Sequence, residues 1–447
     1  MSANYILNNP AWLGEIPSHW DCKKIGSLFT ERKVKVSDKE YPPLSVAKIG
    51  VVPQLDTAVK TDAGDNRKLV RIGDFVINSR SDRKGSCGVS ELDGSVSLIN
   101  IVLTPRNLWN SRYVHYLLRS QPFSEEYYRN GRGIVADLWT TRYSEMKSIL
   151  LPVPPRSEQD QIVRFLDWKV SSINKLISVK RKPIALLHER QSVHISHIVT
   201  HGLRNGVVTK NSGAEWLGDI PEHWHTMRCK YLFSERDERS QDGSEQHLSM
   251  SQKHGLVPDS QLDERRMLSE SYVGGKLCDK DDLVLNRLKA HLGVFALAPQ
   301  SGVISPDYTV LRPSTARILP SFAETVLKSD RCRGELRIRV RGIIEGFWRL
   351  YTDDFNTIVL PVPPLDEQAE IMEYIVEFRD KAKKYEDTLT QEISSLQELK
   401  ARLISDTVTG KIDVRGIQIP EYEFAEENID TENDESMEGM KSETYEE

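Results

Sequence analysis

Apolar residues recur at steps of seven over the last long segment of the chain. Between residues 367 and 407, one repeat position holds Ile375, Ala382, Leu389, Leu396 and Leu403, and the second mostly holds Ile371, Phe378, Tyr385 and Leu399. A helix with apolar residues at both positions of a heptad has a continuous stripe that packs against another helix. The pattern predicts a coiled-coil helix about 60 Å long, at ~1.5 Å per residue.

A second helical pattern follows Pro152, Pro154 and Pro155 near the middle of the chain. Ser157 is the expected N-cap, and apolar residues then recur at helical spacing at Ile162, Leu166, Ile173, Leu176, Ile177, Ile184, Leu187 and Ile198. Pro183 has no amide hydrogen to donate, so it should kink this helix or end one segment of it.

The two predicted helices end alike, because Val199-Thr200 corresponds to Val408-Thr409. Two related helices in one chain are natural partners, so we expect them to pair as an antiparallel coiled coil. The expected interface consists of Leu166, Ile173, Leu176, Leu187, Ile375, Leu389, Leu396 and Leu403. The alternative is that each helix packs on its own domain, since heptads also occur in ordinary core helices.

The rest of the chain is rich in turns and short apolar strands, and it repeats. Trp12–Trp20 returns as Trp216–Trp224 with seven of nine positions identical, and Leu151–Pro155 returns as Leu360–Pro364. Between these motifs, Leu44–Val46 with Gly50–Pro53 corresponds to Leu248–Met250 with Gly255–Pro258, and Gly73–Asn78 corresponds to Asp281–Asn286. A repeat this long indicates two whole domains in tandem, because solenoid units run to about 20–50 residues.

These patterns predict an α+β protein with two tandem α/β domains, each followed by a long helix. The expected parts are a first domain over 1–155, a helix over 156–202, a second domain over 203–364, a helix over 365–415 and a tail over 416–447. Residues 421–447 hold twelve Asp or Glu residues against the single Lys441, which leaves the preceding chain net positive although the whole chain carries −6. An acidic segment of this kind is typical of disorder, and the folded part has a charge that permits nucleic-acid binding.

Composition narrows the class of protein further. The chain has 447 residues, and no apolar run approaches the roughly 18–20 residues of a membrane helix. Met1–Pro10 has neither the basic start nor the apolar core of a secretion signal. The five cysteines are scattered and form no Cys-x-x-Cys, so neither a disulfide framework nor a zinc knuckle is indicated. We expect a cytoplasmic protein without a membrane partner.

Sequence motifs for catalysis are missing. Gly275-Lys276 and Gly410-Lys411 lack the Ser or Thr of a phosphate-binding loop, and Gly131-Arg-Gly133 lacks the third glycine of a dinucleotide fingerprint. His194, His197 and His201 could line one helical face, but no cysteine or carboxylate joins them, so we expect no metal site. The sequence favours a non-catalytic protein over a free-standing enzyme.

The motifs, taken in their duplicated order, resemble the specificity subunit (HsdS) of type I restriction-modification systems. Trp-Leu-Gly-x-Ile-Pro-x-His-Trp heads each half, Gly-Asp-x-Val stands in mid-domain, and Leu-Pro-Val-Pro-Pro-x-x-Glu-Gln opens each long helix. Val408-Thr-Gly-Lys-Ile-Asp413 closes the second helix. The resemblance spans residues 5–417, and Pro183 departs from a uniform coiled coil.

The resemblance implies a DNA-binding protein whose two target-recognition domains each read one half of a bipartite, asymmetric sequence in double-stranded DNA. It implies that the paired helices set the distance between the half-sites. The implied partners are two modification subunits, which bind S-adenosylmethionine and methylate adenine, and restriction subunits, which use ATP and Mg. No cofactor is then expected in this chain. The alternative is a coiled-coil scaffold protein that does not itself bind DNA.

Candidate DNA contacts are basic and amide side chains in loops and at strand ends, because phosphates require Lys or Arg and base edges require Arg, Lys, Asn or Gln. In the first domain they are Lys48, Asn78, Arg80, Arg83 and Lys84, and in the second Lys253, Asn286, Arg287, Lys289 and His291. Arg337, Arg339 and Arg341 alternate with apolar residues, so a strand would place three guanidinium groups on one face. The competing interpretation is that each of these residues is an ordinary solvated side chain, or that the three arginines lie on a charged edge strand. The tryptophans of the head motif are expected to pack in the scaffold.

Overall fold

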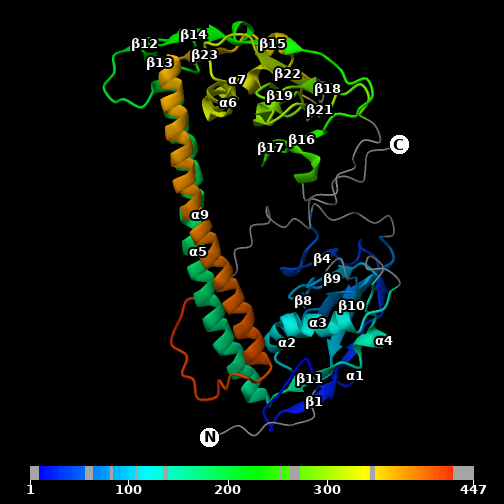
Figure 1. Cartoon of the computed structure of the whole chain (residues 1–447). Coiled ribbons are helices and arrows are strands. Elements are labelled where there is room, and N and C mark those ends of the chain that lie inside the picture. The colour runs from blue at the N-terminus through cyan, green and yellow to red at the C-terminus, as the bar shows by residue number, and fades with distance from the viewer. Residues whose placement is uncertain are drawn as a thin grey trace. The chain divides into compact units, whose positions relative to one another are not determined.

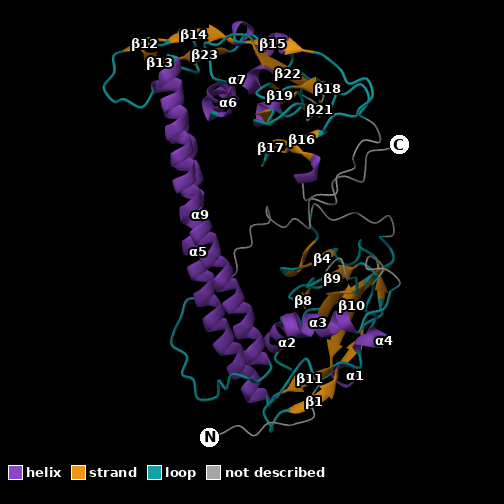
Figure 2. Ribbon diagram, viewed as in Figure 1, coloured by secondary structure: helices purple, strands orange, loops and turns teal. Residues whose placement is uncertain are grey.

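The computed structural model describes residues 10–55, 64–80, 84–106, 109–133, 139–251, 254–261, 272–342 and 348–425 (Figures 1 and 2). The chain divides into two compact units. Unit 1 consists of residues 1–182 and 389–447, and unit 2 consists of residues 183–388. Both units mix helices and strands, which confirms the predicted α+β class. The division cuts each long helix near its middle, whereas the boundaries expected from the sequence lie at the helix ends.

Two long helices, α5 (Arg156–His201) and α9 (Leu365–Val408), contribute one half to each unit. Pro183 lies inside α5, which continues past it, so the expectation that one segment could end there is wrong. The helix also begins one residue before Ser157, the expected cap. The amides of Glu158 and Gln159 instead donate to the carbonyl of Pro155, at 2.9 and 3.0 Å.

The helices pair antiparallel in both units (Figure 1). In unit 1, Lys400 Nζ lies 3.3 Å from Asn174 Oδ1, and Lys180 Nζ lies 2.7 Å from Glu392 Oε2. In unit 2, His188 Nε2 lies 3.1 Å from Glu386 Oε2, and His194 Nε2 lies 3.1 Å from the Tyr374 hydroxyl. Within each unit the partner number falls along α9 as the residue number rises along α5. This order confirms the predicted antiparallel pairing.

The seam between the helices differs in part from the expected one. The buried apolar side chains of the two helices include Ile173, Ile177, Ile375, Ala382, Leu389 and Ile393. Leu187, Leu396 and Leu403 are half-buried, and Leu166 is buried in the core of unit 1. Leu176 is 49% exposed, and Tyr385 and Leu399 are exposed to a similar degree, so their expected places in the seam are wrong. A helix with 3.6 residues per turn drifts about 20° per heptad, which moves the buried position one residue onward to Ile393.

The body of unit 1 is built on a four-stranded antiparallel sheet with the order β2-β10-β7-β8. A three-stranded sheet β3-β6-β9, the hairpin β4-β5 and the pair β1-β11 complete it. Its elements are β1 (Asp21–Lys24), α1 (Ile25–Leu28), β2 (Phe29–Glu31), β3 (Lys35–Val36), β4 (Leu44–Ala47), β5 (Gly50–Pro53), β6 (Arg67–Val70), β7 (Phe75–Asn78), β8 (Cys87–Val89), β9 (Gly94–Val96), β10 (Asn100–Pro105), α2 (Ser111–Arg119), α3 (Gln121–Arg129), α4 (Tyr143–Met146) and β11 (Leu150–Val153).

Unit 2 repeats this plan, with a four-stranded sheet in the corresponding order β15-β22-β19-β20. The hairpin β16-β17 and the pairs β18-β21, β14-β23 and β12-β13 surround it. Its elements are β12 (Thr209–Asn211), β13 (Asp219–Pro221), β14 (His225–Arg228), η3 (Cys229–Tyr231), β15 (Phe233–Arg236), β16 (Leu248–Ser251), β17 (Gly255–Pro258), η4 (Asp259–Gln261), β18 (Lys276–Cys278), β19 (Leu283–Asn286), η5 (Ala290–Leu292), β20 (Phe295–Leu297), β21 (Gly302–Ile304), β22 (Tyr308–Pro313), α6 (Pro320–Lys328), α7 (Asp330–Arg339), α8 (Thr352–Phe355) and β23 (Val359–Val362).

The end of each long helix joins a core that contains a head tryptophan. In unit 1, Trp20 is buried with Val408 and Val414, and the Tyr113 hydroxyl donates to the Val408 carbonyl at 3.2 Å. In unit 2, Trp224 is fully buried, and its Nε1 donates to Glu367 Oε2 at 3.0 Å. Scaffold packing is therefore the role of these tryptophans, as expected.

The first part of the expected tail is docked on α5. Gln161 Nε2 donates to the carbonyl of Ile417 at 2.8 Å, and Ser171 Oγ donates to that of Glu423 at 3.1 Å. Asn174 Nδ2 donates to the carbonyl of Ala425 at 3.2 Å. Residues 416–425 thus differ from the disordered tail expected from composition, and residues 426–447 lie outside the described part.

Candidate nucleic-acid interface

Each unit presents a polar loop where the second strand of its main sheet ends. Asn78 and Asn286 are the last residues of β7 and β19. Asn78 Oδ1 accepts from the amide of Arg80 at 3.0 Å, and Asn286 Oδ1 accepts from the amide of Leu288 at 3.1 Å. Asparagine at these positions shapes the turn by capping a backbone amide two residues onward. The two loops therefore start with the same geometry.

The loop of unit 2 gathers several candidate DNA contacts. Arg287 is half-buried, and its Nε donates to Thr309 Oγ1 at 2.9 Å. Lys289 is exposed. The ring of His291 lies 5.8 Å from that of Trp348 in an edge-on contact. Burial, followed by the charge of Arg337, lowers the pKa of His291, so this imidazole is neutral at physiological pH and can accept or donate a hydrogen bond.

Arg337 and Arg339 form the last turn of α7, not a strand, and the expected row of three guanidinium groups is wrong. Helix formation is favoured locally, because Ser329 Oγ caps the Cys332 amide and Glu335 pairs with Arg339 one turn later. Ile338 is consequently 74% exposed.

The three arginines now have separate roles. Arg339 Nε also donates to Thr357 Oγ1 at 3.0 Å, and Arg341 pairs with Asp354. Within the described residues, the side chain of Arg337 has no hydrogen-bond or ion-pair partner. Arg337 is therefore the arginine of this group that is best placed to contact a ligand.

The candidates of unit 1 lie on two elements. Asn78 ends β7, and Arg80 and Lys84 belong to the loop that follows it. The Arg80 carbonyl accepts from the Tyr128 hydroxyl at 3.4 Å, and Lys84 Nζ lies 5.4 Å from the Tyr128 ring centre. Lys48 is exposed at the tip of the β4-β5 hairpin, where Arg119 donates to its carbonyl. Arg83 in unit 1 and Lys253 in unit 2 lie outside the described residues.

The backbone identifies which loop residues are equivalent between the units. The amide of Thr141 donates to the carbonyl of Ser79 at 3.0 Å, and the amide of Leu350 donates to that of Arg287 at 3.0 Å. Arg287 therefore matches Ser79, which is buried, rather than Arg80. The two units hold different side chains at a matched place on one backbone plan.

A buried carboxylate fixes the start of the strand that carries each loop. Asp74 is 2% exposed, and it accepts from Arg32 at 2.7 and 3.0 Å and from Thr104 Oγ1 at 2.8 Å. It also accepts from the amide of Arg71 at 2.9 Å. A two-point Arg–carboxylate contact has a defined geometry. This contact holds the strands β2, β7 and β10 together below the loop.

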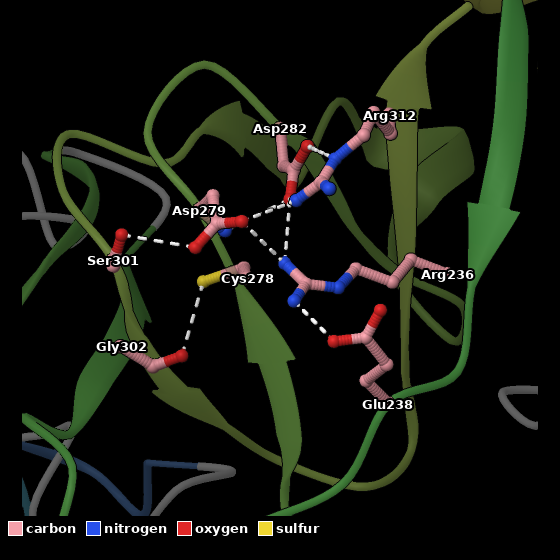
Figure 3. Close-up of polar contacts among 8 residues, drawn as sticks. All are labelled: Arg236, Glu238, Cys278, Asp279, Asp282, Ser301, Gly302 and Arg312. Atoms are coloured by element: carbon pink, nitrogen blue, oxygen red, sulfur yellow. Dashed lines mark hydrogen bonds and ion pairs between the residues drawn. The ribbon is translucent and has the colours of Figure 1, made fainter.

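Unit 2 has an enlarged version of the same cluster (Figure 3). Arg312 donates two hydrogen bonds of 3.0 Å to Asp282, which is equivalent to Asp74, and Arg236 donates to Asp279 at 2.7 Å. A hydrogen bond from Ser301, together with those from Arg312 and Arg236, lowers the pKa of Asp279. The hydrogen bonds of Arg236 and Arg312 to Asp279 and Asp282 anchor β15, β19 and β22.

Sequence patterns did not identify several basic residues near these loops as candidate DNA contacts, among them Lys33, Arg142 and Lys147. The duplication also repeats Arg132 as Arg341 and Trp139 as Trp348. Among the described residues, no group of His, Cys, Asp or Glu side chains could hold a metal ion. None of the described helices is long and apolar enough to cross a membrane.

Comparisons with known proteins give a consistent picture. No protein-family model matches the chain. The chain is 20% identical over 439 residues to the putative type I restriction enzyme MjaX specificity subunit of Methanocaldococcus jannaschii, with 90% of this chain and 96% of that protein covered. It is also 20% identical over 435 residues to the type I restriction enzyme EcoKI specificity subunit of Escherichia coli, with 89% and 90% covered.

A solved structure shares the fold. It comes from work on complex assembly and conformational transition of the type I R-M system, and it covers 89% of this chain and 99% of its own with a TM-score of 0.60 and 14% identity. Sequence comparison and fold therefore agree on the same resemblance.

Proposed function

We propose that this chain, which is similar in sequence and fold to type I restriction-modification specificity subunits, is the DNA-reading subunit of such a complex. The observation that carries the proposal is the repeated backbone with different side chains on it. Ser79 and Arg287 occupy equivalent places at the ends of equivalent strands, and the residues after them differ as well. Two domains with the same backbone plan and different loop side chains would read two different half-sites.

Each loop offers groups suited to DNA. An Arg side chain can donate two hydrogen bonds to guanine, whereas Lys contacts phosphates as a point charge. Arg287, oriented by Thr309, fits the first role, and the exposed Lys289 and Arg337 fit the second. In unit 1, Arg80, Lys84 and Lys48 supply the corresponding charges.

The chemistry is assigned to the partner subunits. In this proposal two modification subunits bind S-adenosylmethionine and methylate adenine, and restriction subunits use ATP and Mg to act on unmodified DNA. The present chain aligns these partners with the target, and the paired helices α5 and α9 connect the two reading units.

The test is an exchange of one recognition body. Residues 37–150 are replaced by the same region of a homologue with a different target, and N6-methyladenine is mapped across the genome of a host that expresses the complex. One half-site should change, and the other half-site should stay the same. The matched control exchanges residues 241–359 and should change only the other half.

Two results would contradict the proposal. A change of both half-sites would show that the units do not read separately. Wild-type complex that shows no salt-sensitive binding to duplex DNA would instead favour a scaffold protein that does not contact DNA.

A further inference from the structure

Unit 1 contains a cavity of about 630 Å³ beside the loop that carries Arg80. It lies between the end of β2, the strands β6 and β10, and the short helix α4. Four basic side chains line it: Lys33, Lys68, Arg142 and Lys147. The single carboxylate in its wall is that of Glu31.

The carboxylate is already shared between two of the lysines. Lys33 Nζ lies 3.2 Å from Glu31 Oε2, and Lys68 Nζ lies 3.8 Å from Glu31 Oε1. Lys68 also donates to the carbonyl of Asn100 at 2.7 Å. Burial lowers the pKa of Lys68, Glu31 opposes this effect, and the charge of Lys33 lowers the pKa further. The cavity therefore has a positive excess that one carboxylate does not neutralise.

The remaining two cations are uncommitted. Within the described part of the chain, the side chains of Arg142 and Lys147 have no hydrogen-bond or ion-pair partner, and both are exposed. The hydroxyl of Ser144 also lines the cavity, but it already donates its hydrogen to Glu145 Oε2 at 2.8 Å. Two unpaired cations at one wall are groups that contact phosphate oxygens in protein–DNA complexes.

This charge is not required by the fold, because unit 2 builds the same backbone without it. The amide of Gly26 donates to the Lys147 carbonyl at 2.9 Å, and the amide of Lys230 donates to the Asn356 carbonyl at 3.3 Å, so Asn356 matches Lys147. By the same helix register Tyr351 matches Arg142. The positive wall is a property of unit 1 alone.

The cavity is continuous with the candidate reading loop. Ser79 and Thr140 line it, and the same two residues hold the loop in place. The carbonyl of Ser79 accepts from the Thr141 amide, and Arg80 forms a β-bridge with Thr140. A ligand in the cavity would therefore lie beside any base that Arg80 contacts.

We propose that this cavity binds one phosphodiester group of the DNA backbone next to the half-site that unit 1 reads. The proposal rests on the proposed function of the chain. Arg142 and Lys147 donate to the two non-bridging oxygens, and Leu98 and Ile101 supply an apolar wall for the adjoining deoxyribose. Such a contact fixes the register of the protein on the duplex and carries no sequence information itself.

The experiment uses the full chain purified with its modification subunits. The affinity for a duplex that contains the target is measured from about 50 to 200 mM salt, for the wild type and for the double variant Arg142→Gln/Lys147→Gln. Loss of one phosphate contact should lower the log–log salt slope by about 0.9, and the affinity should fall by the same factor for target and non-target duplexes. Ethylation of single phosphates should reveal one position that interferes with binding by the wild type and not with binding by the variant.

The matched control is Lys24→Gln/Lys39→Gln, which removes the same charge from exposed positions of unit 1 outside the cavity. This control should retain the interfering phosphate. A double variant with the wild-type slope and the wild-type interference pattern would overturn the proposal. Equal unfolding midpoints of the two double variants would establish that both are folded.

A second arm separates backbone phosphate from a free phosphorylated ligand. Inorganic phosphate and AMP are titrated into the wild-type complex and the cavity variant by calorimetry. Saturable binding that the variant loses, with an unchanged DNA slope, would overturn the assignment to DNA. Wild-type complex without any salt-sensitive DNA binding would refute the proposed function itself, whereas binding by the wild type with no effect of the variant would refute only the cavity.

Discussion

The chain packs tightly against the head motif of unit 1 at Gly410, which follows the end of α9. Its φ of +80° is unfavourable for residues with a side chain, and a Cβ there would lie 2.4 Å from Pro17 Cδ and 3.0 Å from Trp20 Cη2. The glycine thus allows the helix end to reach the head motif. We expect Gly410→Ala to be one of the most damaging single-methyl additions in this protein.

Two other glycines provide a comparison for the free-energy cost of Gly410→Ala. Gly14 has a φ of +64° and nothing within 4 Å of its Cβ position, so Gly14→Ala should cost only about 1 kcal/mol for the backbone conformation. At Gly410 an overlap of about 1–3 kcal/mol adds to this cost, for a total of about 2–4 kcal/mol. In unit 2, Gly202 also follows a long helix and faces a head tryptophan: its φ is +81° and a Cβ there would lie 3.3 Å from Trp224 Cζ2, so the cost of Gly202→Ala should lie between the other two.

The assay is native-state hydrogen exchange of the full chain, followed for the amides of residues 13–20 and 409–412 in unit 1 and of residues 201–204 and 217–224 in unit 2. Local opening free energies are suitable because a two-unit chain need not unfold in a single transition. The expected order of destabilisation is Gly14→Ala, then Gly202→Ala in its own unit, then Gly410→Ala. A cost at Gly410 no larger than that at Gly14 would refute the described contact with Pro17 and Trp20.

Three further expectations follow from single positions. Burial, followed by the charges of neighbouring arginines, lowers the pKa of His115 to about 3, whereas the ring of the unfolded chain titrates near ~6.5. Below pH ~6.5 the unfolded state therefore binds more protons than the folded state. Unit 1 should lose about 1.4 kcal/mol of folding stability per pH unit as the pH falls between these two pKa values. Urea titrations at several pH values should show that His115→Gln removes this slope. Among the described residues, Asp281 is the one non-glycine residue with a positive φ, at 68°. Asp281→Gly should therefore stabilise unit 2 by about 1 kcal/mol, and Gly73→Asp at the equivalent position should destabilise unit 1. Equal urea midpoints for the variants and the wild type would contradict this prediction. For DNA, Arg287→Ala should cost about 1–3 kcal/mol at one base pair, whereas Lys289→Ala should lower the salt slope by about one, and unchanged binding in both would return them to ordinary surface.

Periodicity explains why the architecture could be predicted from the sequence. The head motif around Trp12 and its return at Trp216 revealed the duplication, and the heptad through Leu389 revealed a helix that buries one stripe. The heptad recurs over several turns of one helix, and the duplication recurs in several separate motifs, so a single exception does not erase either signal. The antiparallel pairing of the two helices was predicted from the same repeated pattern, whereas the order of the strands in each sheet was not.

Other features depend on neighbours that no local pattern shows. Arg337–Arg341 alternates like a strand, but the cap at Ser329 and the pairing of Glu335 with Arg339 favour a helix. Leu176 has the right spacing for the seam, yet the helix turns it toward solvent.

The candidate site was predicted only in part for the same reason. The loops of Asn78 and Asn286 were correctly placed at strand ends, because a polar residue after an apolar run is a local signal. Arg142 and Lys147 come from a segment distant in sequence, and only the folded unit places them in one cavity with Lys33.

The discontinuity of unit 1 has a consequence for how the protein is made. Its core contains Val408 and Val414 beside Trp20, whereas unit 2 is one uninterrupted stretch from residue 183 to residue 388. Translation at roughly 5–20 residues per second leaves about 10–50 s between the emergence of residue 182 and that of residue 414. Unit 2 can therefore finish folding on the ribosome while unit 1, whose first segment is made earlier, is still incomplete. During this time unit 1 exposes apolar surface that chaperones can bind. A premature stop codon shortly after residue 388 would consequently harm the oldest part of the nascent chain and spare the part made just before the stop.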